Sequence, residues 1–362
     1  MTALRTRLER LIAAQGPITV AEFMAVCLYD PGHGYYMARN PFGRDGDFIT
    51  APEISQMFGE LVGVWVASAW NAIGRPENLV VAEIGPGRGT LMKDMARTLL
   101  KAAPDLSRTA RFVLVEVSPR LRDAQAETLK DTPARFEWTT DVDALPAGPL
   151  IIVGNELFDA VPIHQYVRTG GVWRERMVGL DEAGQLAFVA GPAAIDPVLL
   201  PPGADRSPDG AIAELAPARI ALMGRIAGRI AAQGGAGLFI DYGHLAPGVG
   251  DTLQAMSGHA YDAILDRPGE ADLTSHVDFE PLAAQARRHG LATAASTQGQ
   301  FLLSMGLLER AGRLGANAGS EVQHRIRADV ERLAGPDQMG ELFKVLCIAQ
   351  PGSLPQTFPI AS

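Results

Sequence analysis

The feature that most constrains this 362-residue chain is the glycine-rich segment EIGPGRGT at residues 83–90. The apolar run at 79–84 predicts a buried strand, and the pattern at 90–103 predicts a helix. Glycines between a strand and a helix let the backbone turn sharply, and they let a ligand approach without a Cβ in its way. The segment therefore predicts a ligand-binding turn in an α/β fold.

The spacing of the glycines indicates which cofactor the turn binds. Gly85, Gly87 and Gly89 follow the pattern G-x-G-x-G, and Glu83 stands just before them at the end of the strand. Dinucleotide sites use G-x-G-x-x-G and hold a pyrophosphate at the helix start. S-adenosylmethionine (SAM) has no phosphate but carries a sulfonium and an ammonium group, which an acid suits, and Pro86 removes an N–H that a phosphate could use. We predict that Glu83 and the three glycines bind SAM, and we keep an NAD-dependent oxidoreductase as the alternative.

The rest of the chain alternates between strand and helix patterns. The strands are continuous apolar runs, which are typical of parallel strands covered by helices on both faces. The alternation predicts βαβ units with right-handed crossovers, and hence a doubly wound, mostly parallel sheet in an α/β fold. The predicted strands are 79–84, 111–117, 134–138, 149–153, 237–241, 291–296 and 342–349, and the predicted helices are 1–12, 53–72, 90–103, 120–129, 216–233, 279–289 and 299–333.

Three segments depart from this alternation. We predict an N-terminal helical cap or lid at 1–75, a SAM-binding domain at 76–362, and a β-rich substrate-side insertion after the fourth strand at 164–215. Within the insertion, residues 164–191 alternate around a Gly-Gly pair, which is typical of a hairpin. We expect residues 192–210 and 242–277 to be loop-rich, the stretch 102–111 to be a loop, and the tail 351–362 to be loose.

Polar residues after the predicted strands supply further cofactor contacts. Glu116 lies at the end of the second predicted strand, where an acid accepts hydrogen bonds from ribose hydroxyls. We expect Asp141, after the third strand, to border the adenine, and Asn155, after the fourth, to contact the cofactor.

The acceptor side of the site is expected where the fourth strand ends. Ligands in doubly wound folds bind beyond the carboxyl ends of the strands, near the switch between the first and fourth strands. Glu156 and Asp159 lie there, and an Asn-Glu pair after an apolar strand is costly unless it meets solvent or a ligand. We predict Glu156 as the catalytic carboxylate, with Asp159 and Glu53 as second choices. The polar run at 43–50, which precedes Glu53, is expected to form a lid over the cofactor.

Composition narrows the classes of partner. The formal net charge is −9, which disfavours sequence-independent nucleic-acid binding because that requires a basic surface. We see no apolar stretch long enough to cross a bilayer. Cys27 and Cys347 lack metal-ligand spacing, so we predict two reduced, buried thiols and no metal site. The segment 1–12 is interpreted as the first helix of the mature protein rather than a targeting peptide.

Several long motifs resemble those of one family. The motifs together are similar to those of the MidA-like family, which comprises the mitochondrial complex I assembly-factor methyltransferases and their bacterial relatives. They extend in order across nearly the whole chain: GRDGDFITAPEISQMFGE (43–60), EIGPGRGTLMKDM (83–95), VEVSPRLR (115–122), NELFDAVPIHQ (155–165), IDYGH (240–244), GDTLQA (250–255), DLTSHVDF (272–279) and ELFKVL (341–346).

The resemblance implies a class I SAM-dependent methyltransferase fold with a seven-stranded sheet. It further implies that the chain methylates an arginine of a complex I core subunit on the quinone-binding side, so that a protein substrate is the expected partner. A homodimer is one expected assembly, and neither nucleic acid nor membrane insertion is expected. A bacterial member is expected in the cytoplasm and a eukaryotic member in the mitochondrial matrix. A SAM-binding scaffold that assists assembly without catalysis is the other alternative.

Overall fold

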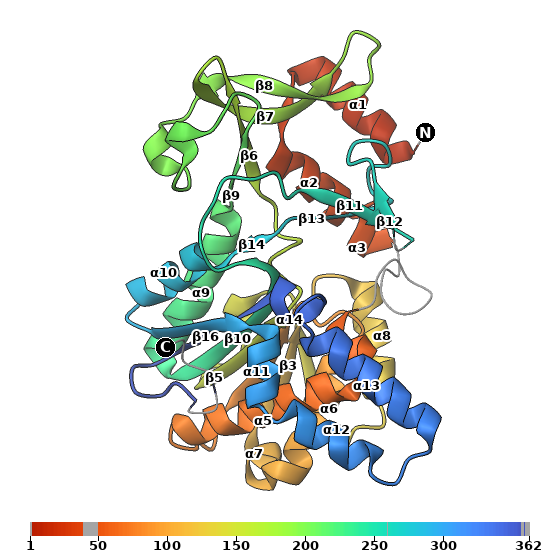
Figure 1. The fold of residues 1–362 in the computed structure, drawn as a ribbon, viewed down its shortest axis with the longest axis vertical. Coiled ribbons are helices and arrows are strands. Elements are labelled where there is room, and N and C mark those ends of the chain that lie inside the picture. Colours follow the sequence, from red (N-terminus) through yellow and green to blue (C-terminus); the bar gives the residue numbers. More distant parts are fainter. Residues whose placement is uncertain (1, 39–49, 259, 356–357, 359–362) are drawn as a thin grey trace. The chain divides into compact units, whose positions relative to one another are not determined.

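The computed structural model describes residues 2–38, 50–258, 260–355 and 358 of the chain. These residues form two compact units, and both are interrupted in sequence (Figure 1). The predicted lid at 43–50 lies outside the described residues except for Thr50. Unit 1 comprises Met1–Phe48, Phe158–Ala221 and Ala246–Asp278, and unit 2 comprises Ile49–Leu157, Leu222–Leu245 and Phe279–Ser362.

A mixed β-sheet forms the centre of unit 2. Its strands follow the order β15-β16-β10-β5-β2-β3-β4, in which neighbours from β10 to β4 are parallel and β16 is antiparallel to both of its neighbours. The sheet has eight strands in all among the described residues, one of them off this path, so the expected count of seven is not confirmed. The bounds are β2 Val80–Ile84, β3 Arg111–Val115, β4 Phe136–Thr139, β5 Leu150–Asn155, β10 Gly235–His244, β15 Ala292–Thr297 and β16 Phe343–Ala349.

The register of the parallel strands places their carboxyl ends at one level. Ile84 of β2 pairs with Gly154 of β5 and with Val115 of β3. Asn155 of β5 pairs in turn with Ile240 of β10. The residues that follow these strands therefore emerge along one edge of the sheet, where ligands bind in doubly wound folds.

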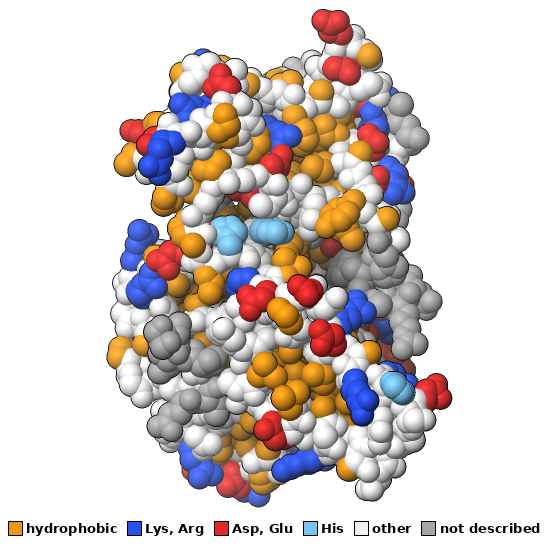
Figure 2. Space-filling view, in the orientation of Figure 1, with side chains coloured by type: hydrophobic (Ala, Val, Ile, Leu, Met, Phe, Trp, Pro, Cys, Tyr) orange, Lys and Arg blue, Asp and Glu red, His pale blue; other side chains and the backbone are white. Residues whose placement is uncertain are grey.

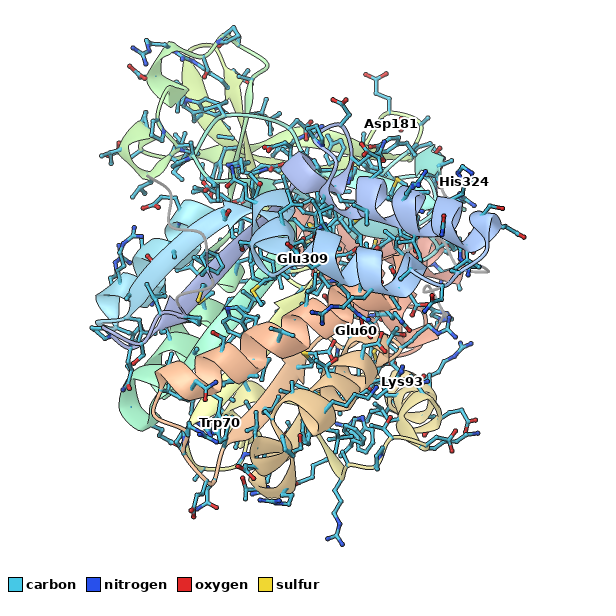
Figure 3. All side chains as sticks on the ribbon, turned by 60° about the horizontal axis from the view of Figure 1, so that its bottom comes forward. Glu60, Trp70, Lys93, Asp181, Glu309 and His324 are labelled. Atoms are coloured by element: carbon cyan, nitrogen blue, oxygen red, sulfur yellow. The ribbon has the colours of Figure 1, made fainter. Side chains whose placement is uncertain are left out.

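Helices α5 (Gln56–Ala72) and α6 (Thr90–Ala102) pack against each other in unit 2. One continuous helix was predicted over 53–72, but Ser55 has extended backbone angles and separates α4 (Ala51–Ile54) from α5. Glu60 lies on α5 and Lys93 on the neighbouring α6, as Figure 3 shows. The remaining helices of this unit are α7 Pro104–Thr109, α8 Pro119–Leu129, α10 Phe279–Arg288, α11 Gln298–Ser304, α12 Leu307–Gly315, α13 Ser320–Ala334 and α14 Met339–Leu342, while α9 (Pro217–Gln233) begins in unit 1 and continues into unit 2.

Unit 1 combines short helices with antiparallel strands. The predicted hairpin is confirmed: β6 and β7 meet at Gly170 and Gly171, whose φ angles of 59° and 77° suit a two-residue hairpin turn. The first sheet follows the order β1-β7-β6-β9, with β8 paired to β7. The bounds are α1 Ala3–Gln15, α2 Val20–Tyr29, α3 Tyr35–Ala38, β1 Ile18–Thr19, β6 His164–Thr169, β7 Val172–Leu180, β8 Leu186–Ala194 and β9 Ile212–Leu215.

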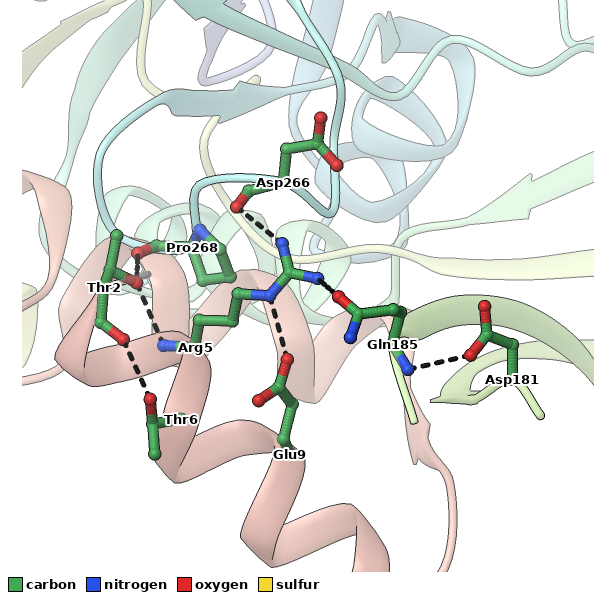
Figure 4. A network of polar contacts seen from close by, with 8 residues as sticks. All are labelled: Thr2, Arg5, Thr6, Glu9, Asp181, Gln185, Asp266 and Pro268. Carbon is green, nitrogen blue, oxygen red and sulfur yellow. Dashed lines mark hydrogen bonds and ion pairs between the residues drawn. The ribbon is translucent and has the colours of Figure 1, made fainter. Parts of the chain in front are cut away.

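The N-terminal helix is part of the core of unit 1. Its apolar face, Leu4, Leu8 and Ile12, is buried. On the adjoining side, the Arg5 guanidinium donates to Glu9 Oε1 at 2.9 Å, to the Asp266 carbonyl at 3.0 Å and to Gln185 Oε1 at 2.7 Å (Figure 4). The prediction of a helix in this segment is confirmed, and three separate segments of unit 1 meet at its arginine.

Three predicted loops contain ordered structure. The span 242–277 holds a three-stranded sheet of order β12-β11-β13, made of Ala260–Asp262, Gln254–Ser257 and Asp272–Thr274. The predicted loop at 102–111 contains helix α7. In the tail, residues 356, 357 and 359–362 lie outside the described residues, so the prediction for them is untested, while Phe358 is 3% exposed and its ring lies 5.7 Å from that of Phe301. The small sheet pairs residues within 254–274, whereas Leu106 of α7 and Phe358 are buried in the hydrophobic core of unit 2.

The boundaries of the two compact units differ from the boundaries of the predicted segments. Because α5 packs on α6, unit 2 begins at Ile49 rather than after residue 75. The division into folding domains at 1–75 and 76–362, with an insertion at 164–215, stays a prediction.

Three general properties bear on function. Cys27 and Cys347 are buried and free, as predicted, and burial raises the pKa of the Cys27 thiol to about 12. Within the described ranges no helix is both long and apolar enough to span a membrane. Acidic and basic side chains are interspersed on the face drawn in Figure 2.

Candidate functional site

The glycine turn joins β2 to α6 in unit 2. Gly85, Gly87 and Gly89 have φ angles of 66°, 51° and 81°, in the left-handed region that glycine adopts without steric cost. Gly89 is the N-cap of α6. The sequence therefore places glycine at the three positions where this backbone requires it, and the predicted strand, turn and helix are confirmed.

Gly85 and Gly154 leave room for the side chain of Leu157 next to the turn. A Cβ on Gly85 would lie 3.1 Å from Leu157 Cδ1, and a Cβ on Gly154 would lie 3.0 Å from Leu157 Cδ2. Leu157 thus packs against the ends of β2 and β5 at once. Its backbone N–H donates to Asp241 Oδ2 at 3.0 Å, so the buried Asp241 of β10 anchors the loop that follows β5.

Glu83 lies inside unit 2 and only 2% of it is exposed. Burial raises the pKa of its carboxyl well above the usual range, opposed only by a hydrogen bond from the Met92 backbone N–H. Its Oε2 is buried and has no hydrogen-bond partner among the described residues. A buried carboxyl with an unused oxygen next to the turn is costly in an empty fold and useful to a ligand that carries donors.

Glu116 follows β3 and is 6% exposed. Its Oε1 accepts from the Ser118 N–H at 2.8 Å, and its Oε2 accepts from Gln125 Nε2 at 3.0 Å. Burial raises the pKa of Glu116, while these donors and Arg122 lower it. The carboxylate is therefore held in a fixed orientation beyond β3, as a ribose acceptor requires.

Sequence reasoning missed Gln125 and Trp138 as parts of this site. Gln125, on α8, donates to the Gly87 carbonyl at 2.8 Å and accepts from Trp138 Nε1 at 2.9 Å. No local pattern marks a glutamine in the middle of a helix, so the signal exists only in the folded chain.

β5 ends at Asn155 and Glu156 follows it, so both residues lie at the carboxyl end of the strand. Glu156 has a φ of 51°, one of two non-glycine residues with positive φ among those described. Its Oε1 accepts from Asn155 Nδ2 at 2.9 Å and from the Ala51 N–H at 3.3 Å. Asn155 Oδ1 is buried without a hydrogen-bond partner among the described residues. A strained backbone and an unused amide oxygen at one point are features of binding sites.

Glu53 is tied to the glycine turn. Its Oε1 accepts from the Thr90 hydroxyl at 2.6 Å, and its Oε2 lies 3.9 Å from Arg88 Nη1. Since Glu53 and Ala51 both belong to α4, this short helix contacts the turn through one residue and Glu156 through the other. The structure thus brings Glu53, Glu156 and Asn155 together in unit 2.

The two remaining predicted residues, Asp141 and Asp159, have other hydrogen-bond partners. Asp141 caps a short 3-10 helix by accepting from the Asp143 N–H, and it forms an ion pair with Arg225. Asp159 belongs to unit 1, where it is 7% exposed. Its carbonyl accepts from the buried Arg219 at 3.1 Å. Their roles toward adenine and acceptor stay predictions.

The residues around the turn fit a cationic nucleoside cofactor. The left-handed glycines give a close approach, and the fixed Glu116 carboxylate offers an acceptor for hydroxyl groups. The unused oxygens of Glu83 and Asn155 offer acceptors for an ammonium group. No group of three or more metal-ligating side chains occurs in the described part of the chain.

Comparison with known proteins agrees with this geometry. The family described as "Putative S-adenosyl-L-methionine-dependent methyltransferase" matches residues 61–297. The chain is 35% identical to the Danio rerio mitochondrial protein arginine methyltransferase NDUFAF7 (95% of this chain, 86% of the relative) and 34% identical to the Homo sapiens protein of the same name (96% and 83%). A crystal structure from Burkholderia thailandensis, bound to S-adenosyl-homocysteine (SAH), superposes with a TM-score of 0.84 at 29% identity, covering 99% of this chain and 95% of that one.

Proposed function

This chain belongs to the MidA-like family of SAM-dependent methyltransferases, and from this premise we propose that it methylates an arginine guanidinium of a protein substrate. The observation that carries the proposal is the carboxylate of Glu156, which Asn155 and the Ala51 N–H orient at the carboxyl end of β5. The names of the relatives, which describe protein arginine methyltransferases, support the same acceptor.

SAM, when bound, supplies an electrophilic methyl group on a sulfonium centre. An arginine is protonated, with a pKa above ~12, so carboxylates must hold the guanidinium and direct one nitrogen toward the methyl group. Glu156 is our first choice for this role, with Glu53 in the same unit and Asp159 as second choices. Positioning of this kind can contribute ~7–11 kcal/mol to a two-substrate reaction.

The test is Glu156→Gln, which keeps the size of the side chain and removes its charge. We expect methylation of protein substrate to be lost, because a neutral amide no longer orients a guanidinium. SAH affinity, measured by calorimetry, should stay within about tenfold, or about 1.4 kcal/mol. The exposed Glu77→Gln in the same unit is the control and should keep full activity. Normal turnover in Glu156→Gln would exclude the role.

We further propose that the acceptor protein is a complex I core subunit on the quinone-binding side, as the family resemblance implies. Mass spectrometry of complex I subunits from cells with and without this chain tests the proposal. An arginine methylated only when the chain is present supports it, and identical spectra contradict it. The cell compartment and the homodimer stay predictions.

Labelled SAM tests catalysis itself. Incubation with a cell lysate should transfer label to a protein band, whereas tight SAM binding without label would support the non-catalytic scaffold. The NAD-dependent alternative is not favoured, because the family that matches is defined by SAM-dependent methyl transfer.

A further inference from the structure

Gln125 forms hydrogen bonds with three residues around the predicted cofactor site of unit 2. It lies on α8 and is fully buried, at 0% exposure. Its Nε2 donates to the Gly87 carbonyl at 2.8 Å and to Glu116 Oε2 at 3.0 Å. One amide therefore joins the glycine turn after β2 to the carboxylate after β3.

The third contact fixes which way the amide points. Trp138 Nε1, on β4, donates to Gln125 Oε1 at 2.9 Å. An indole N–H can only donate, so the oxygen of the amide must face Trp138. The two hydrogens of Nε2 are then directed to the two acceptors, Gly87 O and Glu116 Oε2. Each hydrogen of the amide nitrogen has one partner.

Packing adds to the hydrogen bonds. A Cβ built on Gly89 would lie 3.4 Å from both Cα and Cγ of Gln125, so the space between α8 and the turn at Gly89 is no wider than a single carbon atom would fill. Gln125 thus lies close to the turn at Gly89 and is hydrogen-bonded to it at Gly87. A shift of the turn or of Glu116 would break at least one of these contacts.

We propose that Gln125 is a positioning residue of the SAM site, which holds the glycine turn and the Glu116 carboxylate at the separation that the nucleoside of SAM requires. The inference rests on the assignment of the turn and of Glu116 as cofactor-binding residues. It deepens the proposed function by naming the residue that keeps these two cofactor contacts at a fixed separation.

The charge state of Glu116 distinguishes a positioning role from a purely structural one. A purely structural role of Gln125 would leave the pKa of Glu116 unchanged. Gln125 is one of the donors that lower the pKa of this buried carboxyl, together with the N–H groups of Ser118 and Val117 and the charge of Arg122. Loss of the amide should raise the pKa of Glu116 further. SAH binding should then weaken at a higher pH than in the parent protein.

The experiment is calorimetric titration with SAH between about pH 5 and pH 8. The variant is Gln125→Met, which keeps an unbranched side chain and removes the amide. Gln298→Met is the matched control: Gln298 is also fully buried in unit 2, but its amide donates to the Leu333 carbonyl, away from the turn. We expect Gln125→Met to weaken SAH binding at least ~10-fold. We also expect the fall of SAH affinity at low pH to begin at a higher pH than in the parent protein. The control should bind as the parent does.

The possible results separate the hypotheses. Equal weakening in both variants, or weakening without a pH shift, or unchanged binding by Gln125→Met overturns the positioning role. If Gln125→Met does not fold, Trp138→Phe is measured instead; it removes the orienting donor, so the role requires weaker binding with the same pH shift, and unchanged binding overturns it. Failure of the parent chain to bind SAH overturns the cofactor assignment as well.

Discussion

Gly87 illustrates how a single residue determines what the site can hold. Its φ of 51° lies in the region where side chains with a Cβ are strained, and its carbonyl is fixed by Gln125 at 2.8 Å. Glu156, with the same φ, bears such strain at a position that we assign to the acceptor. Gly87 thus belongs to the predicted cofactor side of the site, and the strained Glu156 belongs to the predicted acceptor side.

We predict that Gly87→Val lowers SAH affinity at least ~100-fold, or about 2.7 kcal/mol. Valine is poorly compatible with left-handed angles, so the turn must change conformation, and its branched side chain fills space that the ligand needs. Calorimetry with SAH measures the loss. Gly184→Val is the control, since Gly184 also has positive φ, at 75°, but lies in unit 1 with open space around its Cβ position. Normal SAH affinity in Gly87→Val would refute the assignment of the turn.

Sequence reasoning proposed the acids and glycines of the site but not the residues that form hydrogen bonds with them. Glu83 and Glu116 lie at the ends of predicted strands and Glu156 just after one, and strand ends can be recognised from apolar runs. Gln125 and Asp241 act through hydrogen bonds to residues 38 and 84 positions away. Such partners depend on how strands align in the folded sheet, which no periodicity in the chain records.

At the scale of elements, helices α5 and α6 approach closely because Gly59 lacks a side chain. A Cβ there would lie 2.7 Å from Asp94 Cβ. Asp94 is consequently buried at 6% exposure, and burial raises its pKa from 3.8 to about 6, with Arg97 opposing and Glu60 adding to the shift. The helix pair thus encloses an acid that ionises less readily than a solvent-exposed aspartate.

We predict that Asp94→Asn makes the chain more stable at neutral pH. A carboxyl whose pKa is raised in the folded state binds its proton more tightly there, so the free energy of unfolding falls as pH rises from about 4 to about 6 and stays reduced above. Removing the charge should recover about 2 kcal/mol at pH 7.5 after loss of the Arg97 contact. Urea unfolding at several pH values measures the effect. Asp131→Asn, the same change at an exposed position, is the control, and a less stable Asp94→Asn at pH 7.5 would contradict the prediction.

Regular elements with a strong apolar pattern were predictable, and those that depend on distant contacts were not. The strands β2, β3, β5, β10 and β16 and the helices α6, α8 and α9 all occur within a few residues of their predicted positions. The break at Ser55 and the small sheet in 242–277 were missed. Short strands such as Asp272–Thr274 carry too few residues for an alternating pattern, so their pairing partners define them.

At the scale of the whole chain, the predicted cofactor residues all belong to unit 2, although the chain enters and leaves that unit repeatedly. These residues lie in a single segment of that unit, Ile49–Leu157, and the turn and Glu116 follow two neighbouring strands of its sheet, β2 and β3. A ligand that joins the turn after β2 to the carboxylate after β3 should therefore stabilise unit 2.

We predict that saturating SAH raises the unfolding temperature. At a ligand concentration of ~100 times Kd the folded state gains about 2.7 kcal/mol, which corresponds to a rise of roughly 4 °C for a chain of this size. Differential scanning calorimetry measures the shift, and NADH at the same concentration is the control ligand. An equal response to both ligands, or none to SAH, would contradict the cofactor assignment.

The two deeply enclosed thiols make this chain convenient for single-site labelling. A thiol reacts through its thiolate, which burial suppresses at Cys27 and Cys347 alike. A cysteine introduced at Val198, which is 79% exposed, should therefore take up a maleimide dye while both natural cysteines remain unmodified. A fluorophore can thus be attached to unit 1 of the otherwise unaltered protein.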